Sequence, residues 1–169
     1  MKITRVIRAA RTLRKHGVSA HIRGNSYRLA RECFRIGFPV SAACAVATLE
    51  TNFQNEFGHD PAAPDMHGAP VTRASYRRML ALAGRGPRQG CGQFQLTSAG
   101  LQDRADQLGG CWRNSANVRV GVEFLAQLRQ EFGEREGFRH FNGSGPAAEH
   151  YADEAMALEQ RWHQLLVKG

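Results

Sequence analysis

Apolar positions recur with helical spacing along most of the chain. Between residues 3 and 15, an apolar residue returns every three or four positions, and arginine or lysine fills the places between. This period is typical of an amphipathic helix. The predicted helices cover residues 3–15, 26–34, 39–50, 72–83, 98–108, 115–132 and a segment that starts near Pro146.

Capping residues support several of these boundaries. Ser26 is a candidate N-cap, Gly37 a candidate stop, and Thr72 a candidate N-cap for a helix that ends near Ala83. No stretch alternates between apolar and polar residues over the length of a strand. The sequence therefore predicts a mainly α fold with at most a short β-hairpin near residues 92–96.

The segment 39–50 differs from the other predicted helices because it is apolar on every face. It reads Pro-Val-Ser-Ala-Ala-Cys-Ala-Val-Ala-Thr-Leu-Glu, and its small side chains allow neighbouring helices to come close. We therefore expect it to be central. After it, residues 54–71 and 84–92 lack periodicity and contain many Gly, Pro, Asp and His residues, which predicts two long loops of the kind that often carry function.

Composition limits the classes of protein that fit. A chain of 169 residues, 42% hydrophobic, is long enough for one packed domain and too short for two. No run approaches the roughly 20 apolar residues of a membrane span, and the basic N-terminus is not followed by the apolar segment of a secretory signal.

The net charge of +8 lies almost entirely at the front of the chain. The first 31 residues carry nine basic side chains and no acidic one, whereas the rest carries 14 basic and 15 acidic side chains. A solubilising arm and a surface that attracts a polyanion both fit this pattern.

The four cysteines do not have the spacing of a zinc site, so we expect no metal and no cofactor. Cys33 and Cys44 lie in apolar helical patterns and are expected to be buried thiols. Cys91 and Cys111 lie in glycine-rich turns, where a disulfide between them is a minor alternative.

Three segments carry candidate chemistry. Glu50 ends the most apolar helix, where burial and the helix C-terminus both favour the protonated carboxyl that glycoside cleavage requires; a surface glutamate at a frayed helix end is the alternative. Gln93 and Gln95 would point the same way in an extended segment and suit sugar hydroxyls. The turn 141–146 precedes Tyr151, which on periodicity alone is a core residue.

Together these segments resemble the goose-type lysozyme and soluble lytic transglycosylase superfamily. The matching pieces, in the family's order, are Glu50-Thr51, Gly92-Gln93-Phe94-Gln95-Leu96-Thr97, Asn117-Val118-Arg119-Val120-Gly121 and Phe141-Asn142-Gly143-Ser144-Gly145 with Tyr151. Further segments, at 55–60, 102–106 and 109–112, resemble the glycosidase domains of lysins from phages of actinobacteria. Thr51 and Phe141 stand where the family usually has Ser and Tyr.

The resemblance implies a lysozyme-like catalytic domain over residues 36–169, preceded by a basic helical extension over residues 1–35. It also implies cleavage of the MurNAc-GlcNAc β-1,4 bond of peptidoglycan, with Glu50 as general acid. Substrate-binding roles follow for five residues: Thr51, Gln93, Gln95, Asn142 and Tyr151. Tyr151 is expected to bond Glu50 or a nearby sugar.

Two outcomes of the reaction remain open. A lytic transglycosylase uses one Glu and forms a 1,6-anhydro product, whereas an inverting hydrolase needs a second carboxylate about 6.5–9.5 Å away. Asp60 and Asp65 are the candidates for that carboxylate, and His59 is placed to orient Asp60. The alternative for Asp60 is an Asx-type turn before Pro61.

Two non-enzymatic functions compete with this interpretation: a basic helical nucleic-acid-binding protein and a wall-binding domain without catalysis. The enzyme hypothesis predicts a monomer that acts in the bacterial cell wall after delivery by phage lysis or a virion. Residues 1–31 would then bind an anionic wall polymer or a membrane surface.

Overall fold

The protein is mainly α-helical. The computed structural model describes residues 3–15, 24–60 and 63–168, and this part of the chain forms helices joined by loops, with isolated β-bridges but no strand. The helices are α1 (Ile3–Lys15), α2 (Asn25–Ile36), α3 (Val40–Thr51), α4 (Arg73–Ala83), α5 (Ala99–Gln107), α6 (Asn114–Phe132), α7 (Glu134–Asn142), α8 (Pro146–Lys168) and a 3-10 turn, η2 (Pro64–Met66). The predicted fold class is confirmed.

Helix α3 is the centre of the packing, as its composition predicts. Every residue from Val40 to Ala47 is buried, so no face of this segment meets solvent. Helices α2 and α8 pack directly against it. Alanine and cysteine side chains let these neighbours approach closely, and their contact excludes water from the whole length of the segment.

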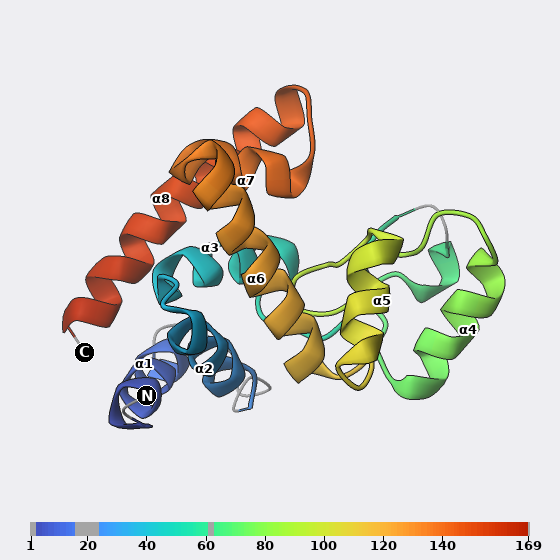
Figure 1. Ribbon diagram of the computed structural model, residues 1–169, viewed down its shortest axis with the longest axis horizontal. Coiled ribbons are helices and arrows are strands. Elements are labelled where there is room, and N and C mark those ends of the chain that lie inside the picture. The colour runs from blue at the N-terminus through green and yellow to red at the C-terminus, as the bar shows by residue number, and fades with distance from the viewer. Residues whose placement is uncertain (1–2, 16–23, 61–62, 169) are drawn as a thin grey trace.

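Helix α6 connects the two sides of the molecule. Figure 1 shows α6 running between one group of helices, α1 to α3 with α7 and α8, and a second group made of α4, α5 and the long loops. Helix α6 packs on α2 and α7 in the first group and on α5 in the second. The loops that follow α3 therefore lie next to the end of that helix and can form a site with it.

Most predicted helix boundaries are confirmed. Gly37 ends α2 in the left-handed conformation, with φ 72°, and Thr72 and Ser75 form a reciprocal capping box at the start of α4. The prediction of Ser26 as an N-cap is wrong, because α2 already begins at Asn25 and Ser26 is buried in its first turn. Helix α7 was not predicted, since its nine residues offer only a short amphipathic pattern.

The two N-terminal helices share the main core. Leu13 of α1 and Leu29 and Cys33 of α2 are fully buried in the same cluster as α3. The boundary drawn at residue 35 falls inside the last turn of α2. Among the described residues, none of the helices is long and apolar enough to cross a bilayer.

Candidate functional site

Glu50 lies in the last turn of α3, where the chain reverses sharply. Asn52 and Phe53 both adopt positive φ, at 48° and 67°, and the Asn52 N–H is bonded to the carbonyls of the preceding turn. Phe53 is fully buried and packs edge-on against Trp162 of α8. This anchored reversal ends the helix one residue after Glu50 and leaves its carboxyl at the edge of the core.

Glu50 opens onto a cleft of about 390 Å³. The cleft lies between the end of α3, the loops after it and the end of α7. Its lining residues are Glu50, Gly58, His59, Asp60, Gln95, Thr97, Phe141 and Asn142. Four of the residues predicted to act on a substrate, Glu50, Asp60, Gln95 and Asn142, therefore share one cavity.

The surroundings of Glu50 favour its protonated form. Burial raises the pKa of Glu50 to about 7, the hydrogen bond from Tyr151 acts in the opposite direction, and the negative charge of Asp60 raises it. The Tyr151 hydroxyl donates to Glu50 Oε1 at 2.7 Å. Burial also raises the pKa of Tyr151 well above its usual range, so the tyrosine keeps the proton that it donates.

Asp60, in the loop after α3, is held by backbone where it lines the cleft. Its Oδ2 accepts a hydrogen bond from the Gly90 N–H at 2.8 Å, and the Gly90 carbonyl in turn accepts from the Gly58 N–H. A Cβ at Gly58 would lie 2.2 Å from Gln95 Oε1, and one at Gly90 would lie 2.9 Å from Asp60 Oδ2. A side chain at either position would displace the end of Gln95 or of Asp60 from where it now lies.

The expected contact between His59 and Asp60 is replaced by a different one. His59 packs edge-on against His67, with ring centroids 5.1 Å apart, and His67 Nε2 bonds the backbone carbonyl of Asp60 at 2.9 Å. The Asp60 carboxylate takes its orientation from Gly90 instead. The alternative Asx turn depends on Pro61, which lies outside the described residues.

The two glutamines of the 92–97 segment point in different directions. Gln95 lines the cleft, whereas Gln93 is fully buried and its Oε1 accepts from Asn114 Nδ2. The expectation that they point the same way is wrong because the segment is a tight turn rather than an extended strand. A single bridge joins Cys91 to Leu96, and Gln95 has φ 43°. A hairpin-like turn is thus present, but its side chains do not alternate between two faces as they would in a strand.

Thr51 also lies outside the cleft and supports the site through a contact with backbone. It is buried, and its hydroxyl donates to the Gln93 carbonyl at 3.2 Å. The end of α3 is thereby tied to the turn that carries Gln95. Gln93 and Thr51 do not line the cleft with Glu50, and the structure places both in its supporting layer.

Asn117 and Gly121 explain how α6 holds that turn. Asn117 Oδ1 accepts from the Phe94 N–H and its Nδ2 donates to the Cys91 carbonyl, at 3.1 and 2.8 Å. One helical turn later, a Cβ at Gly121 would lie 2.4 Å from the Phe94 ring. Residues four positions apart lie on the same face of a helix, so Asn117 and Gly121 both face this turn. Asn117 bonds its backbone, and the absence of a side chain at Gly121 leaves room for the Phe94 ring.

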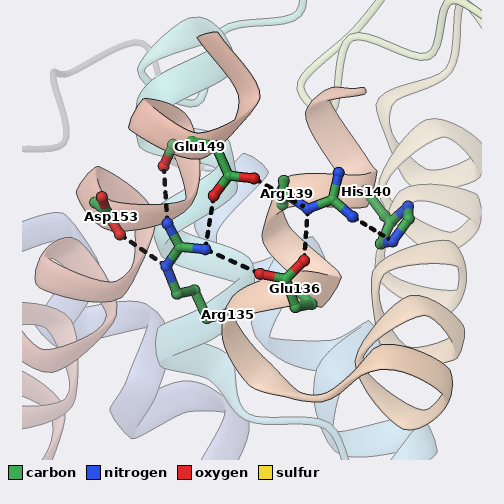
Figure 2. A network of polar contacts seen from close by, with 6 residues as sticks. All are labelled: Arg135, Glu136, Arg139, His140, Glu149 and Asp153. Carbon is green, nitrogen blue, oxygen red and sulfur yellow. Dashed lines mark hydrogen bonds and ion pairs between the residues drawn. The ribbon is translucent and has the colours of Figure 1, made fainter. Parts of the chain in front are cut away.

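The corner between α7 and α8 presents Asn142 to the cleft and Tyr151 to Glu50. Figure 2 shows Arg135 of α7 reaching the first turns of α8, where it bonds Asp153 and Glu149, both at 2.8 Å. Arg139 joins the same network through Glu136. Exposed ion pairs are individually weak, and this network links α7 to the first turns of α8.

A second hollow continues the cleft beyond Asp60. It measures about 830 Å³ and shares Asp60 and Thr97 with the first cavity. Its other lining residues come from the end of α4, the loop after it and the start of α5: Leu82, Ala83, Gly86, Pro87, Arg88, Ser98 and Ala99. The two cavities adjoin at Asp60 and Thr97, and together they are called the groove.

Two further candidates lie away from the groove. Asp65 is exposed on η2 and pairs with Arg78 of α4 at 2.6 Å, so its carboxylate does not line the cleft. Cys91 and Cys111 are buried free thiols with their Sγ atoms 2.9 Å apart, and Cys33 and Cys44 are buried thiols as predicted. Within the described residues, no group of three His, Cys, Asp or Glu side chains could hold a metal ion.

No family model, curated protein or solved structure matches the chain.

Proposed function

We propose that the protein cleaves the MurNAc-GlcNAc β-1,4 bonds of peptidoglycan glycan strands, with Glu50 as the general acid. The observation that carries this proposal is the state of Glu50, a buried carboxyl with a pKa of about 7 that faces a groove. A carboxyl with this pKa still holds a proton near neutral pH, as an acid catalyst must when a glycosidic bond breaks.

In the proposed acid step, Glu50 transfers its proton to the glycosidic oxygen while the bond from that oxygen to the anomeric carbon breaks. Tyr151 stabilises the carboxylate that remains, because its hydroxyl already donates to Oε1. Loss of the proton also leaves a negative charge near the positive charge that develops on the sugar ring.

Asp60 supports hydrolysis as the second half of the reaction. In this scheme its carboxylate removes a proton from water, and the oxygen of that water forms the new bond to the anomeric carbon. Asp60 lines the same cleft as Glu50, and its charge acts on Glu50. The Gly90 N–H holds the carboxylate in place before substrate arrives.

The groove also suits a glycan strand as substrate. Asn142 and Thr97 line it with an amide and a hydroxyl that can both donate to and accept from sugar hydroxyls. Gln95 offers its Oε1 as an acceptor, because its Nε2 already donates to the Glu56 and Gly92 carbonyls. Its continuation past Asp60 adds room for neighbouring sugar units and for the peptides that they carry.

The decisive variant is Glu50→Gln, which keeps the shape of the side chain and removes the transferable proton. We expect clearance of a peptidoglycan suspension to slow by about 10²–10⁴-fold or more. Glu131→Gln, which neutralises an exposed glutamate on α6, is the matched control and should keep wild-type activity. A Glu50→Gln protein that clears cell walls at the normal rate would refute the proposal.

Mass spectrometry of the products separates the two reaction types. Hydrolysis leaves a reducing end, whereas intramolecular attack leaves a 1,6-anhydro end that is lighter by one water. The role proposed for Asp60 predicts the reducing end.

A further inference from the structure

Helix α1 has one buried face and one strongly basic face. Its buried residues, Val6, Ala9, Ala10, Thr12 and Leu13, turn toward the body of the protein. Its exposed positions carry Arg5, Arg8, Arg11, Arg14 and Lys15, and the helix contains no acidic residue. In the part of the chain that the structure describes, these five cations form no ion pair, whereas Arg35, Arg88, Arg129 and Arg135 each do.

The basic face forms a groove together with the end of α8. Helices α1 and α8 are in contact, and Figure 1 shows the last turns of α8 beside α1. The groove measures about 580 Å³ and is lined by Thr4, Ile7, Arg8, Arg11, Thr12, Lys15, Leu165 and Lys168. All the charged side chains in this lining are cations, so the groove is built to attract an anion.

Two exposed aliphatic residues are chain neighbours of residues that line this groove: Ile3 precedes Thr4, and Val167 precedes Lys168. Ile3 and Val167 are 62% and 71% exposed, and Ile7 within the groove is 37% exposed. Water solvates these side chains poorly, and in the described part of the chain nothing covers them. A surface that joins cations to exposed aliphatic residues is typical of helices that lie in the interface of an anionic bilayer.

The aliphatic residues distinguish a lipid surface from other polyanions. A soluble phosphate polymer offers no apolar group that Ile3 or Val167 could contact. Single-stranded nucleic acid is bound largely by stacking on aromatic side chains, and this groove has aliphatic ones. Lipid provides both partners, because phosphate headgroups lie directly above the start of the acyl chains.

We propose that the groove between α1 and the last turn of α8 binds the phosphate headgroups of anionic lipid. Arg8, Arg11, Lys15 and Lys168 contact the phosphates, while Ile3, Ile7 and Val167 enter the boundary with the acyl chains. The site is separate from the glycan cleft, since Tyr151 and Lys168 lie about 25 Å apart along α8. Lipid binding and glycan cleavage can therefore be measured independently.

The first test is co-sedimentation of the full chain with vesicles. We expect binding to vesicles that contain phosphatidylglycerol and none to vesicles of phosphatidylcholine alone. Arg8→Glu/Arg11→Glu should weaken binding at least about tenfold, because each basic residue near an anionic surface contributes measurably to attraction. Arg77→Glu/Arg85→Glu, with the same change of charge at exposed positions on and after α4, should bind like the wild type.

The second test separates lipid from a soluble polyanion. Ile3→Ser/Val167→Ser keeps every charge and alters only exposed positions, so the fold is unaffected. We expect several-fold weaker vesicle binding for this variant, together with unchanged cleavage of soluble glycan fragments. Normal vesicle binding by this variant, or displacement of the wild type from vesicles by soluble poly(glycerol phosphate) or DNA, would overturn the lipid assignment. Equal binding to both kinds of vesicle would overturn the role of the cations.

Discussion

The residues that line the cleft come from two kinds of structure, helix around Glu50 and loop around Asp60, and each is called a wall of the cleft here. The Glu50 wall consists of helix: residues 40–47 of α3 are buried, and Tyr151 of α8 bonds the carboxyl of Glu50 in the last turn. The Asp60 wall consists of loop, in which glycine backbone replaces side chains and the Gly90 N–H bonds the carboxylate. Two carboxyl groups thus face the same space from an apolar and from a polar environment.

The different surroundings of Glu50 and Asp60 correspond to the different roles proposed for them, general acid and general base. Loss of hydration at the Glu50 wall favours a proton-bearing acid. At the Asp60 wall, the Gly90 N–H holds one carboxyl oxygen, Oδ2, by a hydrogen bond. A pair of carboxyl groups in contrasting surroundings is the arrangement that acid and base catalysis on one bond requires.

The strongest test of the comparison is Asp60→Asn. Asparagine keeps an oxygen for the Gly90 N–H but cannot accept a proton from water, so hydrolysis should slow by about 10²-fold or more. Asp65→Asn serves as the control, because Asp65 pairs with Arg78 outside the cleft and its loss should leave activity unchanged. The readout is the rate of reducing-end formation from peptidoglycan. Near-normal turnover by Asp60→Asn would remove Asp60 from the mechanism.

A second test measures how much the burial of Glu50 lowers the free energy of unfolding. The pKa of Glu50 is about 7 in the folded protein, against 4.5 as its ordinary value. Between these values the folded state holds a proton that the unfolded chain has lost, so stability falls as pH rises through this window. Glu50→Gln removes the penalty and should raise the free energy of unfolding by up to about 3 kcal/mol near pH 8.

The same variant should show little gain near pH 4, where Glu50 is protonated in both states. Urea titrations at the two pH values give the difference, with Glu131→Gln as the control. A gain of equal size at both pH values would show that the effect does not arise from ionisation of Glu50.

The smallest expected effect concerns Tyr151→Phe. The hydrogen bond from Tyr151 lowers the pKa of Glu50, so its removal should raise that pKa. The alkaline limb of the pH–rate profile should move upward by up to about one pH unit, with a few-fold loss of rate near neutral pH. A rate loss without any movement of that limb would restrict Tyr151 to packing.

Much of the fold could be predicted because its signals are local. The small side chains of 40–47 indicated a central helix, and Gly37 and Thr72 marked helix ends through conformations and bonds within a few residues. Ser26 misled because capping residues are also tolerated inside a first turn. Helix α7 was missed because it depends on packing against α6 and α8.

The site was less predictable because its geometry depends on contacts between distant segments. Glu50 was found from its place at the end of an apolar helix. The inward orientation of Gln93 follows from a turn held by Asn117, which lies 24 positions later in the sequence. The support of Asp60 by Gly90 likewise spans 30 positions, and no local pattern encodes it.

The glycine backbone at positions 58 and 90 has a consequence for how the sequence can evolve. Where the surface of a site is main chain, a ligand contacts backbone atoms that many different sequences can supply. Neighbouring residues can then change over generations while the surface that a ligand contacts stays the same. Two proteins can share such a wall and have few identical residues.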